Sequence, residues 1–263
     1  MAQQIERTVI DGSYRLADDQ VAEIRRRGCG VLRGVLSGEE MDGHRPVLRD
    51  YVMAKREAMS AIEQAVGASP TETIFSLETA PRSVVDLVTS PRLGEIAARV
   101  LGVEAVRLLH FSGFFKPSGG PGTPWHQDLT YMPLNTDKVV SIWIPLTDIT
   151  QDMGGLLFAE GSHLQGELMP FKDVERFQIV QHGPMQAGDA SLHMGWTIHS
   201  SLPNSSARMR EVITIGYYAD GTRIQKRGEV PIVQSFLDTY FAGLKAGDLA
   251  EGPLNPVVFR FPA

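Results

Sequence analysis

The sequence predicts a mainly β fold with flanking α-helices, and three features of its 263 residues lead to that class. From about residue 105 onward, short runs rich in Val, Ile, Phe, Tyr and Trp are separated by Gly, Pro, Asn and Asp, a pattern typical of strands and turns. The first third instead has apolar residues at helical spacing and helix-capping signals. No repeat, low-complexity tract or linker interrupts the chain. We therefore expect a β-sandwich or barrel preceded by helices.

Three helices are expected before the first strand of this core. The first covers residues 18–27, where apolar residues recur at helical spacing. The second opens with a Ser-Gly-Glu-Glu capping box at residues 37–40 and runs toward residue 66. The third covers residues 90–102, with Ser and Pro at its start and Gly at its end, which are the preferred positions of these residues.

The predicted strands follow in the middle of the chain. They span residues 105–115, 139–146, 155–159, 184–187, 190–194 and 210–219. A further helix is expected at residues 235–245, in a C-terminal segment that folds over the barrel. We expect one domain over residues 1–263, because barrels and sandwiches of this length commonly form a single domain. Its parts are N-terminal helices at about 1–104, a β core at about 105–220 and a C-terminal segment at about 221–263.

Composition and charge narrow the classes of partner. The formal net charge is −6, and no block of Lys and Arg is present that would follow a phosphate backbone, so nucleic acid is not expected as a partner. The single cysteine, Cys29, excludes an internal disulfide and any Cys-x-x-Cys site, which fits a reducing cytoplasm. The chain has neither a signal-peptide pattern nor an apolar stretch of the roughly 18 residues that a membrane span needs. We expect a cytoplasmic protein that acts on a small molecule and has no membrane partner.

Two histidines and an aspartate form a candidate metal site. His126 and Asp128 are two residues apart, so an extended strand would point both side chains to one side, with Gln127 facing the other way unless the strand bends. His199 follows the strand at 190–194 and can supply a third ligand from across the barrel mouth. Two histidines and one carboxylate hold one face of a non-haem Fe(II) and leave the opposite face open.

Arg210 strengthens this interpretation, because a His-x-Asp tripeptide alone recurs by chance. Arg210 opens an apolar strand and shares one face with its alternate residues. A charge buried on that face needs an anionic partner, and the distal carboxylate of a small diacid bound to the metal meets that need. We prefer His199 to His193 as the third ligand, because only His199 stands directly ahead of the turn that leads to Arg210.

Several motifs together resemble the phytanoyl-CoA dioxygenase family of Fe(II)/2-oxoglutarate-dependent oxygenases. They extend over most of residues 105–219, and their combination is specific. The motifs are Phe115-Lys116-Pro117, Trp125-His126-Gln127-Asp128, Ile142-Trp143-Ile144-Pro145-Leu146, Gly154-Gly155-Leu156, Gly161-Ser162-His163, Gly188-Asp189, and His199-Ser200-Ser201-Leu202-Pro203-Asn204-Ser205 with Arg210.

The resemblance implies a double-stranded β-helix, a cupin-like jelly roll, with flanking helices. It implies that His126, Asp128 and His199 bind Fe(II), and that Arg210 binds the distal carboxylate of the co-substrate 2-oxoglutarate. O2 is the second co-substrate, and succinate and CO2 are the co-products. By the same resemblance, the residues that line or assist the co-substrate site are Ser201, Gln127 and Trp143, with Ser112 as a further candidate.

The implied reaction is the oxidation of a C–H bond in a small organic substrate. Related halogenases have a small residue in place of the iron-binding carboxylate, so Asp128 argues against halogenation. Hydroxylation is the default outcome, and epimerisation or cyclisation in secondary-metabolite tailoring are the other outcomes of the same chemistry. Two alternatives stay open from the residues: a jelly-roll ligand-binding protein whose metal is structural or absent, and a zinc-dependent hydrolase, because two histidines and a carboxylate also suit zinc. The sequence carries no motif that indicates an oligomeric state.

Overall fold

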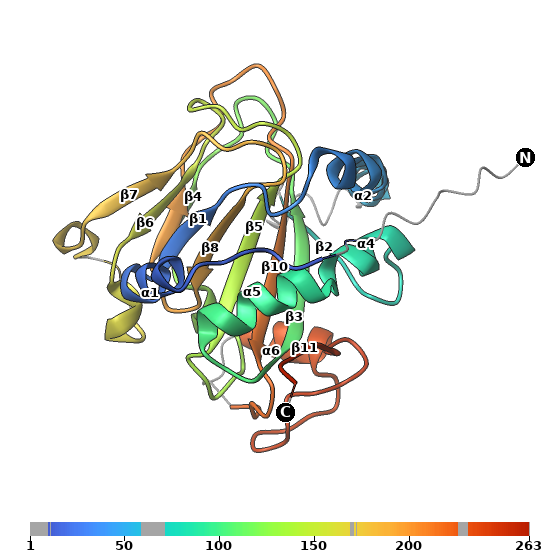
Figure 1. The fold of residues 1–263 in the computed structure, drawn as a ribbon, viewed down its shortest axis with the longest axis vertical. Coiled ribbons are helices and arrows are strands. Elements are labelled where there is room, and N and C mark those ends of the chain that lie inside the picture. Colours follow the sequence, from blue (N-terminus) through green and yellow to red (C-terminus); the bar gives the residue numbers. More distant parts are fainter. Residues whose placement is uncertain are drawn as a thin grey trace, which may run out of the picture.

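Two antiparallel sheets form the centre of the protein (Figure 1). The computed structural model describes residue 10 and residues 12–58, 72–168, 171, 173–225 and 231–262. The larger sheet has the strand order β1-β8-β5-β10-β3-β11, with β2 also paired to β3, and the smaller sheet has the order β4-β9-β6-β7. Helices cover one face of the larger sheet. The predicted mainly β fold with flanking helices is confirmed.

Most strands lie where the sequence places them. The larger sheet consists of β1 (Cys29–Leu32), β2 (Glu72–Ile74), β3 (Ala105–Phe114), β5 (Val139–Pro145), β8 (Ala190–Met194), β10 (Val212–Ala219) and β11 (Val257–Arg260). The smaller sheet consists of β4 (Thr123–His126), β6 (Leu156–Ala159), β7 (Ile179–His182) and β9 (His199–Ser201). The strand expected at 184–187 is wrong. That segment holds only an isolated bridge between Met185 and Ile149, because Pro184 has no N–H to donate to a ladder, and the strand lies earlier, as β7.

The described helices are α1 (Asp18–Arg27), α2 (Gly38–Ala58), α4 (Arg82–Val88), α5 (Pro91–Leu101) and α6 (Pro231–Tyr240). Of these, α2 and α5 begin at the predicted capping signals. The capping box at α2 is confirmed, since Ser37 and Glu40 exchange side-chain to backbone hydrogen bonds. The expected continuation of α2 toward residue 66 lies outside the described residues. Helix α4 was not predicted, because its N-cap is a proline that makes no side-chain cap. Helix α6 begins at Pro231, earlier than the predicted helix at 235–245.

The side chains of β10 alternate between the two faces of the larger sheet. Ile213, Ile215 and Tyr217 pack against the helices in one apolar core, as the alternation of a strand requires. Thr214 points the other way, into a cavity between the sheets that Arg210 also lines. The predicted sharing of one face by Arg210 and alternate β10 residues is therefore confirmed, and the site lies on the side of the sheet away from the helices.

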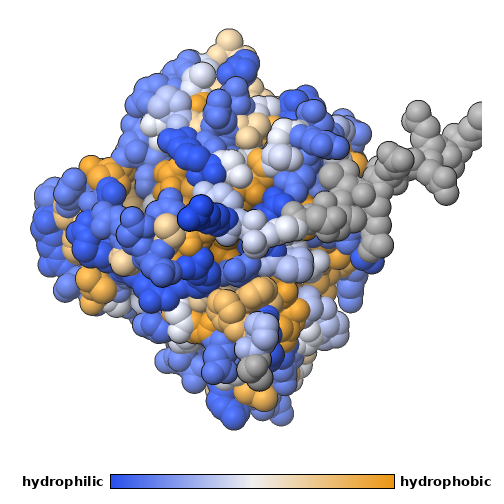
Figure 2. Space-filling model, viewed as in Figure 1, coloured by the Kyte–Doolittle hydropathy of each residue, from blue (hydrophilic) through white to orange (hydrophobic). Residues whose placement is uncertain are grey.

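The C-terminal segment closes the structure at one end. β11 pairs with the first residues of β3, and α6 packs with Tyr218 of β10 in a second apolar cluster (Figure 1). Hydrophilic side chains predominate on the face over α1 and α5, with smaller hydrophobic patches among them (Figure 2). Within the parts of the chain that the structure describes, no helix is both long and apolar enough to cross a bilayer.

Candidate metal centre and its cavity

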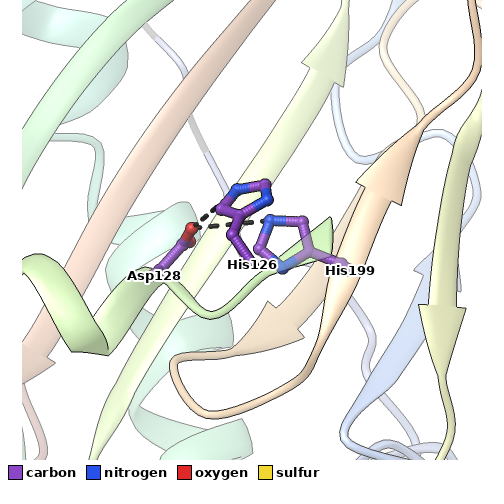
Figure 3. Close-up of side chains that lie close together, drawn as sticks. All are labelled: His126, Asp128 and His199. Carbon is purple, nitrogen blue, oxygen red and sulfur yellow. Dashed lines mark ion pairs between the residues drawn. The ribbon is translucent and has the colours of Figure 1, made fainter. Parts of the chain in front are cut away.

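His126 and His199 are cross-strand partners in the smaller sheet. β4 pairs with β9 so that these two residues lie opposite each other, and their ring centroids are 4.0 Å apart. Asp128 does not continue the strand, because β4 ends at His126 and a 3-10 helix spans Asp128–Tyr131. Gln127 is still extended and the chain turns at Asp128, and both histidines and the aspartate point toward one another (Figure 3).

The three side chains offer their ligand atoms to one point. Asp128 Oδ1 lies 3.6 Å from His126 Nε2 and 3.4 Å from His199 Nε2. The Nδ1 atoms point away from the centre, to the carbonyl oxygens of Pro124 at 2.9 Å and Thr197 at 3.0 Å. A carbonyl only accepts hydrogen bonds, so each Nδ1 carries the ring hydrogen and each Nε2 keeps its lone pair. One atom from each residue lies within 4.8 Å of the other two, as a metal site requires.

The second carboxylate oxygen of Asp128 is held from the other sheet. Ser141 Oγ donates to Oδ2 at 2.7 Å, and His193 Nε2 lies 3.0 Å from the same atom. Ser141 and His193 are themselves cross-strand partners, on β5 and β8. The carboxylate therefore presents Oδ1 to the two histidines while Oδ2 is fixed. From the sequence, His193 was only a rival candidate for the third ligand; its contact with Asp128 was not predicted, because it depends on the pairing of β5 with β8.

The charges of the cluster favour ligand binding. Burial by itself would raise the pKa of Asp128, but His199, His193 and His126 outweigh it and hold the pKa well below its usual range. Burial is also the main cause that lowers the pKa of His199 well below the ordinary value, with His126 and His193 adding to it. At neutral pH the aspartate is thus ionised and His199 is neutral, the protonation states in which both bind metals.

Arg210 lies in the same cavity with an incomplete set of partners. Its side chain is only 2% exposed, one terminal nitrogen donates to the carbonyl of Gly154, and its guanidinium carbon lies 5.4 Å from the centre of the Trp143 ring. The Nε atom has no hydrogen-bond partner within the described chain. Burial lowers the pKa of Arg210 to about 10, so the group stays protonated at neutral pH. A buried cation of this kind needs an anion.

Ser201 lines the cavity, but its hydroxyl is already engaged. It accepts hydrogen bonds from Lys116 Nζ at 2.8 Å and from Thr123 N at 3.1 Å, and donates to Thr123 Oγ1 at 2.9 Å. Lys116 also donates to the carbonyl of Leu202 at 3.0 Å. Burial, and then repulsion by Arg210, lower the pKa of Lys116 to about 7. The predicted role of Ser201 beside the co-substrate stays a prediction; its observed contacts fix β9.

Gln127 is placed differently from Trp143. Trp143 lines the cavity, whereas Gln127 does not and is fully buried. Its amide nitrogen donates to the carbonyls of Gly166 and Trp196, and its amide oxygen accepts from Leu168 N. Gln127 thus ties a loop to the turn that carries Asp128. Its expected co-substrate role stays a prediction that these contacts do not support.

The cavity has a volume of about 370 Å³ and extends well beyond the candidate metal ligands. Strands β2, β3 and β10 form one wall, and α6 forms another. The lining residues outside the metal end include Glu72, His110, Ser112, Thr214, Ile232 and Phe236. Ser112, a candidate from the sequence, is therefore part of the cavity wall. A space of this size and mixed polarity suits a small organic molecule.

Residues 24–212 match the sequence pattern of the family described as Phytanoyl-CoA dioxygenase (PhyH). The chain belongs to this family. The resemblance stated from the motifs is confirmed, and it covers the strands that carry the whole candidate site, from β4 to the start of β10.

Relatives of this family member include a 1-deoxypentalenic acid 11-beta-hydroxylase of Streptomyces exfoliatus, 32% identical over 73% of this chain and 77% of that protein. The phytanoyl-CoA dioxygenase domain-containing protein 1 of Danio rerio is 29% identical over 63% of this chain and 59% of that protein. An ectoine dioxygenase of Bordetella parapertussis is 28% identical over 60% of this chain and 54% of that protein. The chain thus spans only about half the length of several curated relatives that it matches.

Solved structures with the same fold include the non-haem alpha-ketoglutarate-dependent carbocyclase SnoK from nogalamycin biosynthesis. Its TM-score is 0.72 at 22% identity, over 94% of this chain and 99% of that chain. The epimerase SnoN in complex with Fe3+, alpha-ketoglutarate and nogalamycin RO has a TM-score of 0.72 at 20% identity, over 90% of this chain and 96% of that chain. These likenesses confirm the predicted jelly-roll fold.

Proposed function

We propose that this family member is a non-haem Fe(II)/2-oxoglutarate-dependent oxygenase that oxidises a C–H bond of a small organic substrate. The family and the named relatives support this reaction class. The observation that carries the proposal is the convergence of two imidazole Nε2 atoms and one carboxylate oxygen on one point in a cavity. That donor set on one side of an ion, with open space opposite, is the arrangement of non-haem iron oxygenases.

The residues present fit an iron ion. His126 and His199 would bind it through Nε2, since their Nδ1 atoms are hydrogen-bonded to carbonyls. Asp128 would bind it through Oδ1, since Ser141 and His193 hold Oδ2. Such outer contacts orient ligands and raise metal affinity.

The cavity also fits 2-oxoglutarate. Arg210 would bind the distal carboxylate of the co-substrate, because its buried guanidinium has a free Nε and no ion-paired anion among the described residues. A guanidinium is the side chain best suited to a carboxylate, since its planar donors match the two oxygens. Trp143 would form one side of this subsite, where it already packs on the guanidinium.

When bound, the iron would supply the activation of O2 that couples the oxidative decarboxylation of 2-oxoglutarate, to succinate and CO2, to substrate oxidation. The protein itself orients the ligands, binds the distal carboxylate and holds the substrate C–H bond near the open side of the metal. Leu156 and Phe114 line the cavity and help to exclude water from it.

The outcome of the oxidation is proposed from the relatives. The Streptomyces relative is named as a hydroxylase, and two proteins of the same fold are named as a carbocyclase and an epimerase of nogalamycin biosynthesis. Hydroxylation of a small secondary metabolite is the default proposal, with epimerisation and cyclisation as the other outcomes. The presence of a carboxylate at Asp128 argues against halogenation. A cytoplasmic location completes the proposal, because the co-substrate is a central metabolite of the cytoplasm.

The test is oxygen-dependent turnover of 2-oxoglutarate. Purified protein supplied with Fe(II), 2-oxoglutarate and a panel of small organic compounds should form succinate in air and none under nitrogen. His199→Ala removes one of three ligands and should reduce succinate formation to background. His163→Ala is a suitable control, because His163 contacts Arg25 O of α1 and does not line the cavity. Product formation under nitrogen without 2-oxoglutarate would instead indicate zinc-dependent hydrolysis, and retention of ligands without turnover would indicate a binding protein.

A further inference from the structure

One wall of the cavity carries polar atoms that have no partner. Ser112 of β3 and Thr214 of β10 are cross-strand neighbours, and both line the cavity. The hydroxyl of Thr214 is buried and makes no hydrogen bond within the described chain, and the same holds for Nδ1 of His110, two residues from Ser112 along β3. Buried polar groups are normally paired, so two orphaned atoms in one cavity wall indicate a missing polar ligand.

Glu72 adds an acidic group to this wall. It lies on β2, opposite Phe114 of β3, and its half-buried side chain lines the cavity. Burial is the main cause that raises the pKa of this carboxyl; a hydrogen bond from the Ser112 hydroxyl acts in the opposite direction, and repulsion by Asp128 adds to the rise. Among the residues that the structure describes, no Lys or Arg is ion-paired with Glu72. Asp128 and Arg210 account for the proposed binding of iron and 2-oxoglutarate, so the Glu72 carboxyl is not needed for either.

The rim of the cavity next to Glu72 is apolar. Ile74 of β2 is 54% exposed and Ile232 of α6 is 52% exposed, and both line the cavity. Phe236, one turn along α6 from Ile232, continues this apolar surface and packs against His110. Large aliphatic side chains that stay exposed at a cavity mouth mark a surface that a ligand covers.

We propose that Glu72 determines substrate specificity by binding a cationic nitrogen, so that the substrate is a small amphipathic amine whose apolar part covers Ile74 and Ile232. This assignment rests on the proposed function for the identity of the cavity as the substrate site. An ammonium group pairs with the carboxylate through a charge-assisted hydrogen bond. A neutral ligand would leave the carboxylate unpaired at a desolvation cost, and an anionic ligand would be repelled by both Glu72 and Asp128.

The proposal is tested by comparing amines with alcohols of the same shape. Protein loaded with Fe(II) and 2-oxoglutarate under nitrogen is titrated in a calorimeter with 2-phenylethylamine and 2-phenylethanol, and with cyclohexylmethylamine and cyclohexylmethanol. Each amine should bind at least about tenfold more tightly than its alcohol, the size expected for one charge-assisted contact. Glu72→Gln keeps the shape and removes the charge, so it should weaken amine binding about tenfold and leave alcohol binding within about twofold. Glu104→Gln changes the same charge at an exposed position and should alter neither.

Each result decides for or against the proposal. It is overturned if the wild-type protein binds no amine more tightly than the paired alcohol, or if Glu72→Gln weakens amine and alcohol equally. The affinity for 2-oxoglutarate is measured in the same calorimeter and should be equal in the wild type and Glu72→Gln. Absence of 2-oxoglutarate binding would contradict the proposed function, whereas intact 2-oxoglutarate binding without amine preference contradicts only the role of Glu72.

Discussion

The two ends of the cavity differ in how completely their polar atoms are bonded. At the metal end, the Nδ1 atoms of both candidate histidine ligands and Oδ2 of Asp128 have protein partners, and the two Nε2 atoms and Oδ1 face the centre. On the wall formed by β3 and β10, the hydroxyl of Thr214 and Nδ1 of His110 have none. The metal end is thus pre-organised by the protein, whereas the opposite wall depends on a ligand for its hydrogen bonds.

The difference has a structural cause. The metal end combines a cross-strand pair from each sheet, His126 with His199 and Ser141 with His193, and both pairs meet at Asp128. The pair on the other wall, Ser112 with Thr214, belongs to one sheet and faces α6 across open space. The candidate metal ligands are held firmly, and the wall of β3 and β10 keeps unpaired groups for a substrate. This division suits a family whose members share a reaction but differ in substrate.

Arg210→Met would test the anionic subsite and should have the largest effect. It removes a charge-assisted contact from a buried site while keeping the volume of the side chain, so 2-oxoglutarate affinity should fall roughly 30- to 150-fold. Fe(II) affinity should stay unchanged, because no metal ligand is altered. Calorimetric titration of both ligands checks this. Arg208→Met is the control, since Arg208 contacts the sulfur of Met153 instead; an equal loss in the control would contradict the assignment.

His193→Leu would test the support behind Asp128. Loss of the contact to Oδ2 should reduce Fe(II) affinity about 10- to 100-fold, the usual effect of removing an outer partner of a ligand. The measurement is Fe(II) binding under nitrogen against a competing chelator. His182→Leu removes another buried histidine, whose partner is Ser191. If both variants bind Fe(II) like the wild type, the contact from His193 does not support Asp128, and the proposed pre-organisation of the metal end is contradicted.

Gln127→Leu would separate a structural amide from a co-substrate contact. The substitution orphans Leu168 N and two carbonyls, so the free energy of unfolding should fall by about 2 kcal/mol. The affinity for 2-oxoglutarate should stay within about threefold of the wild type, because Gln127 does not line the cavity. Urea unfolding and calorimetry measure the two quantities. A large loss of 2-oxoglutarate affinity with unchanged stability would restore the role expected from the sequence.

Lys116→Met would reveal a change in the pH dependence of stability. The pKa of Lys116 is lowered to about 7 in the folded protein, from 10.5 for an ordinary lysine. Between these values the unfolded chain binds more protons than the folded one, so the stability of the wild type relative to Lys116→Met should rise with pH and level off below about pH 7. Urea unfolding across this range checks the sign. Parallel curves for the two proteins would show that Lys116 is charged throughout.

The predictions from sequence succeeded where the signal is local. The cap of α2 and the ends of α1 depend on residues only a few positions apart, and strands β3 and β8 follow from runs of β-branched and aromatic residues. The strand expected at 184–187 failed, because proline interrupts the ladder. The short helix α4 has no side-chain cap and so gave no signal.

The candidate site divides in the same way. His126, Asp128, His199 and Arg210 were found because their spacing and neighbours form a motif in one dimension. The contributions of Ser141, His193 and Glu72 were not found. Each depends on which residue lies opposite on another strand, and strand register is set by packing across the whole sheet rather than by nearby residues.

By itself, the sequence determined the fold class, the family and the four residues proposed for the candidate site, because these follow from periodicity and from short motifs. Only the tertiary structure decided which oxygen of Asp128 is free, which histidine supports it and which carboxyl faces the far wall of the cavity. Those facts arise where two sheets and a C-terminal helix meet, between residues that are distant in the chain and adjacent only in the folded protein.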